Sequence, residues 1–178
     1  MIKRLLLLPL LLWLGGCASQ YSISEQQVQQ YLNDKVVKQF TLDSGRMLVE
    51  SGVQSLEVSL GEQPERISVK ATAALKIKSP VFPLSATMVA KFSAKPRYEP
   101  SNHGLYLDDM QLEDVQLTPE KLQTLINPVA RDFANQAKGL LQLQPIYVLD
   151  DSKATEAKIA SMTKSIKVEP GQLILMFK

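Results

Sequence analysis

The chain has 178 residues, of which 45% are hydrophobic and 21% are charged, with 20 basic and 18 acidic side chains. This balanced composition suits one globular domain with a sizeable core and argues against a strongly basic nucleic-acid-binding protein. One cysteine and one histidine exclude an internal disulfide and leave too few ligands for an ordinary zinc site.

The first 16 residues are predicted to be a signal peptide. Lys3 and Arg4 precede a leucine-rich run over residues 5–14. A run of about 10 apolar residues is typical of a secretion signal and is far too short to span a bilayer. Loss of the two leader cations would leave 18 basic and 18 acidic residues, so the mature protein is expected to be near neutral.

The signal ends in Leu14-Gly15-Gly16-Cys17, which resembles the bacterial lipobox. In that motif the cysteine is acylated and becomes the new N-terminus. Several acyl chains anchor a protein durably, whereas one chain is only marginal. We therefore expect residues 17–22 to be a tether with palmitate-type lipidation at Cys17, and residues 23–178 to form one domain. Ala18 is not the aspartate that retains many lipoproteins in the inner membrane, so the motif implies the periplasmic face of a Gram-negative outer membrane.

The mature chain is expected to open with an amphipathic helix. Ser24 and Gln27 have the spacing of a capping box, and Ile23 and Val28 stand at staple positions. An apolar stripe at helical spacing continues through Val28, Tyr31, Leu32, Val36 and Phe40. The polar face has few Lys or Arg residues, so we expect the helix to lie on the domain's own core and not on a membrane.

Four long antiparallel strands are predicted next, over residues 47–60, 66–78, 84–95 and 105–117. Each alternates apolar and polar side chains, which is typical of a sheet with one wet face. The alternation changes parity once near residues 52–55 and twice in the last strand. Each change predicts a bulge, and together they predict strong curvature.

A second, longer helix is predicted from Thr118 as N-cap and Pro119 as its first residue. Its apolar stripe comprises Leu122, Leu125, Ile126, Val129, Phe133, Ala137, Leu140 and Leu141. Pro128 lies inside this stripe and should kink the helix. An extended piece at 144–149, a weaker helix at 150–164 and a terminal hairpin turning at Glu169-Pro170-Gly171 should complete the domain.

Motifs for chemistry are scarce. His103 is alone in a loop, and the acidic residues Asp108, Asp109, Glu113 and Asp114 lack the spacing of a calcium loop. No phosphate-binding glycine loop or nucleophile elbow is present in the sequence. We therefore expect a protein that is not an enzyme and that has no metal or cofactor.

Four stretches spread along the chain carry a family resemblance: Tyr21-Ser22-Ile23-Ser24-Glu25, Leu117-Thr118-Pro119-Glu120-Lys121, Gln144-Pro145-Ile146-Tyr147-Val148-Leu149, and Ile166-Lys167-Val168-Glu169-Pro170-Gly171. Together they resemble the YceB-like lipoproteins, an enterobacterial family grouped under a domain of unknown function. The resemblance implies a curved antiparallel sheet wrapped around a long helix, similar to the tubular lipid-binding (BPI-like) superfamily. It implies no catalytic residue, and only Cys17 inherits a role.

The predicted interior leaves two functions open. Its small side chains would either let the long helix pack closely on the sheet or leave room for an apolar ligand such as an acyl chain. The lining predicted for a ligand is Ala73, Leu75, Ala86, Met88, Ala90, Ile126, Val129 and Phe133. The alternative function is an adaptor or scaffold without enzymatic activity that binds another envelope or cell-wall protein.

Overall fold

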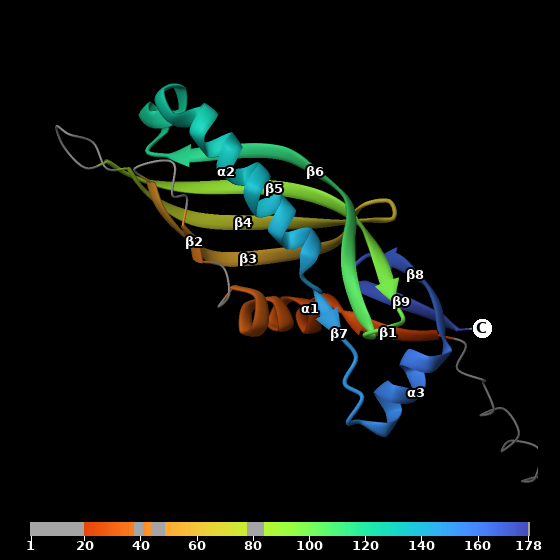
Figure 1. The fold of residues 1–178 in the computed structure, drawn as a ribbon. Coiled ribbons are helices and arrows are strands. Elements are labelled where there is room, and N and C mark those ends of the chain that lie inside the picture. Colours follow the sequence, from red (N-terminus) through yellow and green to blue (C-terminus); the bar gives the residue numbers. More distant parts are fainter. Residues whose placement is uncertain (1–19, 38–40, 44–48, 78–83, 178) are drawn as a thin grey trace, which may run out of the picture.

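The protein is an α+β domain with two antiparallel sheets. The computed structural model describes residues 20–37, 41–43, 49–77 and 84–177. The larger sheet has six strands in the order β2-β3-β4-β5-β6-β7, and the smaller has three in the order β1-β9-β8. Figure 1 shows the long curved strands of the large sheet with α2 lying across them, and the small sheet with α3 at one end. The predicted fold class is confirmed.

Four long neighbouring strands make up most of the large sheet, as the alternation predicts. Short strands pair at its two edges. The six strands are β2 (Thr41–Asp43), β3 (Val49–Gln63), β4 (Arg66–Ile77), β5 (Leu84–Glu99), β6 (Gly104–Thr118) and β7 (Tyr147–Val148).

The predicted bulges lie where the alternation changes parity. The register of β3 on β4 shifts between Val53 and Ser55, and that of β5 on β6 shifts at two places. Arg66 holds the bulge around Asp109 in place: its guanidinium donates to Asp109 Oδ2 at 3.0 Å and to the Asp109 carbonyl at 2.8 Å. It also donates to the Ser93 carbonyl at 3.1 Å, so one side chain ties three strands together.

The third strand is longer than the sequence predicts. Pro96 was expected to begin a loop, but β5 continues to Glu99, and Pro96 pairs with Leu107. A register shift directly precedes this segment, between Ser93 and Lys95. Proline is tolerated in a sheet next to such an irregularity because a ladder bond is already missing there.

The small sheet contains residues that the sequence assigns to the tether. β1 (Gln20–Ser24) pairs with β9 (Gln172–Phe177), which pairs in turn with β8 (Thr163–Glu169). Residues 20–22 therefore belong to the folded domain and not to the predicted tether over 17–22. The hairpin of β8 and β9 is as predicted, and Gly171 in its turn has φ +75°, a conformation that favours glycine.

The long helix α2 (Gln123–Leu143) starts later than predicted. Pro119 has an extended backbone and follows a cis peptide bond, and a 3₁₀ turn, η4 (Glu120–Leu122), comes before the α-helix. Thr118 is therefore not the N-cap. The side chain of Gln123 instead accepts from Leu117 N–H at 2.9 Å and donates to the Val115 carbonyl at 3.1 Å, which fastens the start of α2 to the end of β6.

The first helix, α1 (Glu25–Tyr31), starts with the predicted capping box. Ser24 accepts from Gln27 N–H at 3.3 Å, and the Gln27 side chain accepts from Ser24 N–H at 2.9 Å. The helix continues as a π-helical turn, η2 (Leu32–Val36). Val28, Leu32 and Val36 are buried, as the stripe predicts.

Polar residues of α1 close the edge of β3. Gln29 donates to the Leu56 carbonyl and accepts from Val58 N–H at 2.8 Å, while Glu25 accepts from Leu60 N–H at 2.8 Å. Among the described residues, β2 pairs with β3 over Glu50–Gly52, and α1 supplies partners to backbone groups further along the same edge.

Candidate functional site

The buried faces of α2 and of the sheet carry small side chains among larger ones such as Phe133 and Met88. On the helix, Ala130 and Ala134 are fully buried and Ala137 is 3% exposed. On the sheet, Ala90 and Ala94 of β5 are fully buried. Small residues on facing surfaces allow close approach of helix and sheet.

All eight residues of the predicted lining lie in or against the one hydrophobic core. Register explains their grouping, because Ala73 pairs with Met88, and Leu75 pairs with Ala86. Seven are buried, and Val129 is half-buried against the core. The seven buried residues are Ala73, Leu75, Ala86, Met88, Ala90, Ile126 and Phe133.

Exposure along this lining rises toward one end. Ala90 is completely inaccessible, whereas Ala86 is 7% and Ile126 is 6% exposed, and Val129 is half-buried. We call the stretch around Ala86, Ile126 and Val129 the open end. Pro128 is exposed, so it does not stand between α2 and the sheet to hold the two apart.

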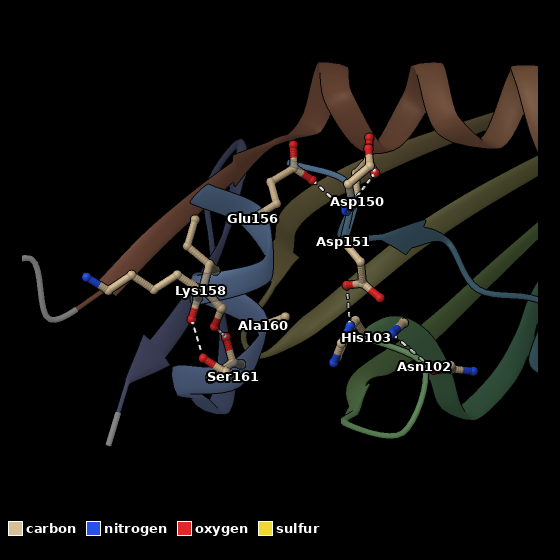
Figure 2. Close-up of polar contacts among 12 residues, drawn as sticks. Asn102, His103, Asp150, Asp151, Glu156, Lys158, Ala160 and Ser161 are labelled. Atoms are coloured by element: carbon tan, nitrogen blue, oxygen red, sulfur yellow. Dashed lines mark hydrogen bonds and ion pairs between the residues drawn. The ribbon is translucent and has the colours of Figure 1, made fainter. Parts of the chain in front are cut away.

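The histidine loop forms a separate polar cluster at the other end of the sheet. His103, with φ +55°, places Nδ1 2.5 Å from Asp151 Oδ1 (Figure 2). The His103 carbonyl accepts from Leu149 N–H at 3.1 Å. Among the described residues no hydroxyl group is bonded to the imidazole, so the cluster has an acid and a base but lacks the nucleophile of a triad. It joins the β5–β6 loop to the segment that leads into α3 (Ala154–Met162).

The acidic residues of β6 form ion pairs with neighbouring strands. Asp109 pairs with Arg66, and this hydrogen bond holds the pKa of Asp109 below its usual value. Asp108 pairs with Arg97 at 2.9 Å, which raises the pKa of the guanidinium. Within the described ranges no three acidic, histidine or cysteine residues are grouped as a metal site would require.

An apolar pocket that the sequence did not reveal lies beside α3. It has a volume of about 380 Å³, and its walls include Tyr21, Ile159, Met162 and Phe177. These residues come from β1, α3 and β9, so no single stretch of sequence signals the pocket. The expectation that residues 20–22 were tether also hid one wall.

The predicted anchor lies outside the described residues. Nothing in the structure bears on Cys17 or on the signal peptide over 1–16. No described helix is both long enough and apolar enough to cross a membrane.

Comparison with known proteins identifies relatives along nearly the whole chain. The family described as Protein of unknown function (DUF1439) matches residues 23–172. A protein of Escherichia coli K12 named Uncharacterized lipoprotein YceB is 30% identical over 172 residues, covering 92% of this chain and 91% of its own. Its counterpart of the same name in Salmonella typhimurium LT2 is 29% identical over 171 residues, with the same coverage.

The solved structure of a lipopolysaccharide binding protein is among those that the chain matches. The match covers 89% of this chain and 40% of the other, with 11% identity and a TM-score of 0.33. A score this low carries no argument about fold or ligand. The expected likeness to the tubular lipid-binding superfamily therefore stays a prediction.

Proposed function

This chain belongs to the DUF1439 family, whose relatives above are named lipoproteins, and from that premise we propose that it is an envelope protein anchored through acylated Cys17. We further propose that it is not an enzyme and that it binds an apolar ligand, a lipid acyl chain, between α2 and the concave sheet. Its place is the periplasmic face of the outer membrane.

The observation that carries the ligand proposal is that buried alanines occur both on α2 and on the sheet. An alanine buries little apolar area, so separating helix from sheet along Ala90, Ala130 and Ala134 loses less contact than separating larger side chains would. An inserted acyl chain would restore that contact. The ligand would enter at the open end, where Ala86, Ile126 and Val129 are least covered.

The test is extraction of noncovalent lipid from the mature protein purified from membranes. We expect stoichiometric lipid from the wild type and a large loss from Ala86→Phe, which fills the open end without introducing charge. Thr87→Phe is the matched control, because Thr87 is the next residue of β5 and faces the opposite side of the sheet. Wild-type protein that yields no noncovalent lipid would contradict the proposal.

A second candidate function, the adaptor, is favoured by the closed core. Ala90 and Ala134 have no accessible surface, so no free space lies against them. Crosslinking in intact cells would then capture the same envelope protein repeatedly. Reproducible capture together with lipid-free purified protein would establish the adaptor and reject the lipid carrier.

The anchor has its own test. Mass spectrometry of the purified protein should show an N-terminal acylated Cys17, and Cys17→Ser should release the protein from the membrane or stall its processing. A mature protein that is cut elsewhere and has a free thiol would contradict the anchor.

A further inference from the structure

The pocket beside α3 is apolar and lies at the first described residues of the chain. Gln20, the first described residue, forms part of its wall together with Tyr21. Ile159 is 7% exposed, and Met162 and Phe177 are half-buried, so the apolar floor is reachable from outside. We call the surface formed by Gln20, Tyr21, α3 and Phe177 the α3 pole.

The pole is held rigidly against the large sheet. Tyr98 at the end of β5 donates to the Ala160 carbonyl at 2.9 Å, and burial raises the pKa of its phenol. Thr163 donates to the Ile159 carbonyl at 2.8 Å, which closes the end of α3. The pocket is therefore a preformed feature of the fold.

The distance to the predicted anchor is short. Only three residue steps separate Cys17 from Gln20, and a fully extended chain spans at most about 3.6 Å per residue, or roughly 11 Å in all. The polar headgroup layer is itself about 5–8 Å thick on each side of a bilayer. An acylated Cys17 would therefore leave the α3 pole no room to stand clear of the membrane surface.

We propose that the α3 pole docks on the bilayer and that its pocket receives the apolar part of a membrane lipid. This inference rests on the proposed acylation of Cys17. Tyr21 supplies a ring with a polar hydroxyl, a side chain suited to the boundary between headgroups and acyl chains, and Phe177 adds apolar surface.

Charge on the pole fits a phospholipid surface. Lys158 lines the pocket, and Figure 2 shows its side chain extending from α3 along β1. Lys164 is exposed directly after α3. Neither lysine forms an ion pair with another described residue, whereas nearby Lys153 pairs with Glu156 at 3.0 Å. A lysine near an anionic bilayer is attracted to its surface.

Docking at this pole also orients the molecule. The open end of the α2 interface is at the other end of β5: Ala86 and Tyr98 are 12 residues apart, which is roughly 40 Å measured along the curved strand. Figure 1 shows the start of α2 at the end of the molecule away from α3. The docked protein would hold its proposed ligand entrance well away from its own membrane.

The test places spin labels on the acylated, mature protein in vesicles of phosphatidylethanolamine with a minor fraction of phosphatidylglycerol. Acylated Cys17 does not react with the label, so Met162→Cys and Thr155→Cys report on the pocket and Gln116→Cys on the distant end of β6. We expect the ratio of oxygen to nickel-chelate accessibility to be several-fold higher at 162 and 155 than at 116. K158E combined with K164E should lower the ratio at 162, whereas Lys121→Glu, at the distant end, should not.

Two results would overturn the docking proposal. If the nickel chelate reached the labels at 155 and 162 as readily as the label at 116, the α3 pole would be exposed to water and not docked on the bilayer. A label at 162 shielded from both reagents would show that the pocket is filled by the protein's own acyl chain. The mass of the same sample reports acylation of Cys17 separately, so failure of docking is distinguished from failure of the anchor.

Discussion

α2 and α1 contact the same large sheet by different means. α2 lies across one face of the sheet and packs through apolar side chains, with Phe133 at 5% exposure and Ala134 fully buried. α1 also buries Val28, but it reaches the edge of β3 with Glu25 and Gln29, which bond to strand backbone. A face offers apolar surface, whereas an edge offers unpaired N–H and C=O groups. The position of a helix on a sheet thus decides whether apolar or polar side chains attach it.

The largest loss of stability should come from removing a buried aromatic side chain of α2. Phe133→Ala should lower the free energy of unfolding by about 3–5 kcal/mol, because it removes a buried aromatic ring and leaves a cavity. Leu143→Ala on the same helix, where the side chain is 73% exposed, should change it by less than about 0.5 kcal/mol. Chemical denaturation measures both, and equal effects would show that α2 is not held by its buried face.

A smaller loss in the free energy of unfolding is expected from removing the bonds between α1 and the edge of β3. Gln29→Leu should cost about 1–3 kcal/mol, because Val58 N–H and the Leu56 carbonyl lose their partner while apolar volume is kept. Gln30→Leu, on the neighbouring exposed position, is the control. Hydrogen exchange at Val58 should also accelerate in the Gln29 variant. Unchanged stability and exchange would mean that water replaces the glutamine without cost.

The capping box at the start of α1 should contribute less to the free energy of unfolding than the bonds of Gln29. Ser24→Ala removes the acceptor for Gln27 N–H and should cost about 1 kcal/mol, which is typical for loss of an N-cap. Gln27→Ala removes the other half of the box and should cost no more. Thermal unfolding of both, with Gln26→Ala as the exposed reference, would detect the difference; a fully neutral Ser24→Ala would contradict the cap.

The smallest effect belongs to an exposed ion pair that involves neither helix. Lys91 donates to Glu62 at 3.1 Å, and this hydrogen bond lowers the pKa of Glu62 from its ordinary value of 4.5. A lowered carboxyl pKa stabilises the fold above pH 4.5, and this contribution is lost as the pH falls further. Exposed pairs contribute about 0–1 kcal/mol. The stability difference between wild type and Glu62→Gln should therefore shrink below pH 4.5, and a difference that grows there would reverse the assigned sign.

Apolar patterning predicted the face contacts well. The alternation of β6 moves from Leu107 to Met110 to Val115, and all three are buried because bulges restore the inward direction. The capping box of α1 was predictable for a similar reason: Ser24 and Gln27 act on each other within one turn.

Features that depend on partners distant in sequence were not predictable. In the sequence, Gln29 resembles any polar residue on a helix surface. Its partner Val58 is 29 residues further along the chain, and only the fold brings the two together. Thr118 and Pro119 carry a strong local signal for a helix start, but the bonds from Gln123 to the end of β6 place that start at Gln123. The pocket beside α3 needs three separate segments to form. In the candidate site, the grouping of the lining was predictable, whereas the closure of the core around Ala90 was not.

The covered edge of β3 has a consequence for neighbouring copies. Proteins tethered to one membrane are confined to a plane and meet each other often, and an open strand edge would let one copy add to the sheet of the next. Glu25 and Gln29 already bond the Leu56 carbonyl and the N–H groups of Val58 and Leu60, so these groups are not open to an incoming strand. Two polar side chains of α1 thus protect part of this edge from strand addition by a neighbouring copy.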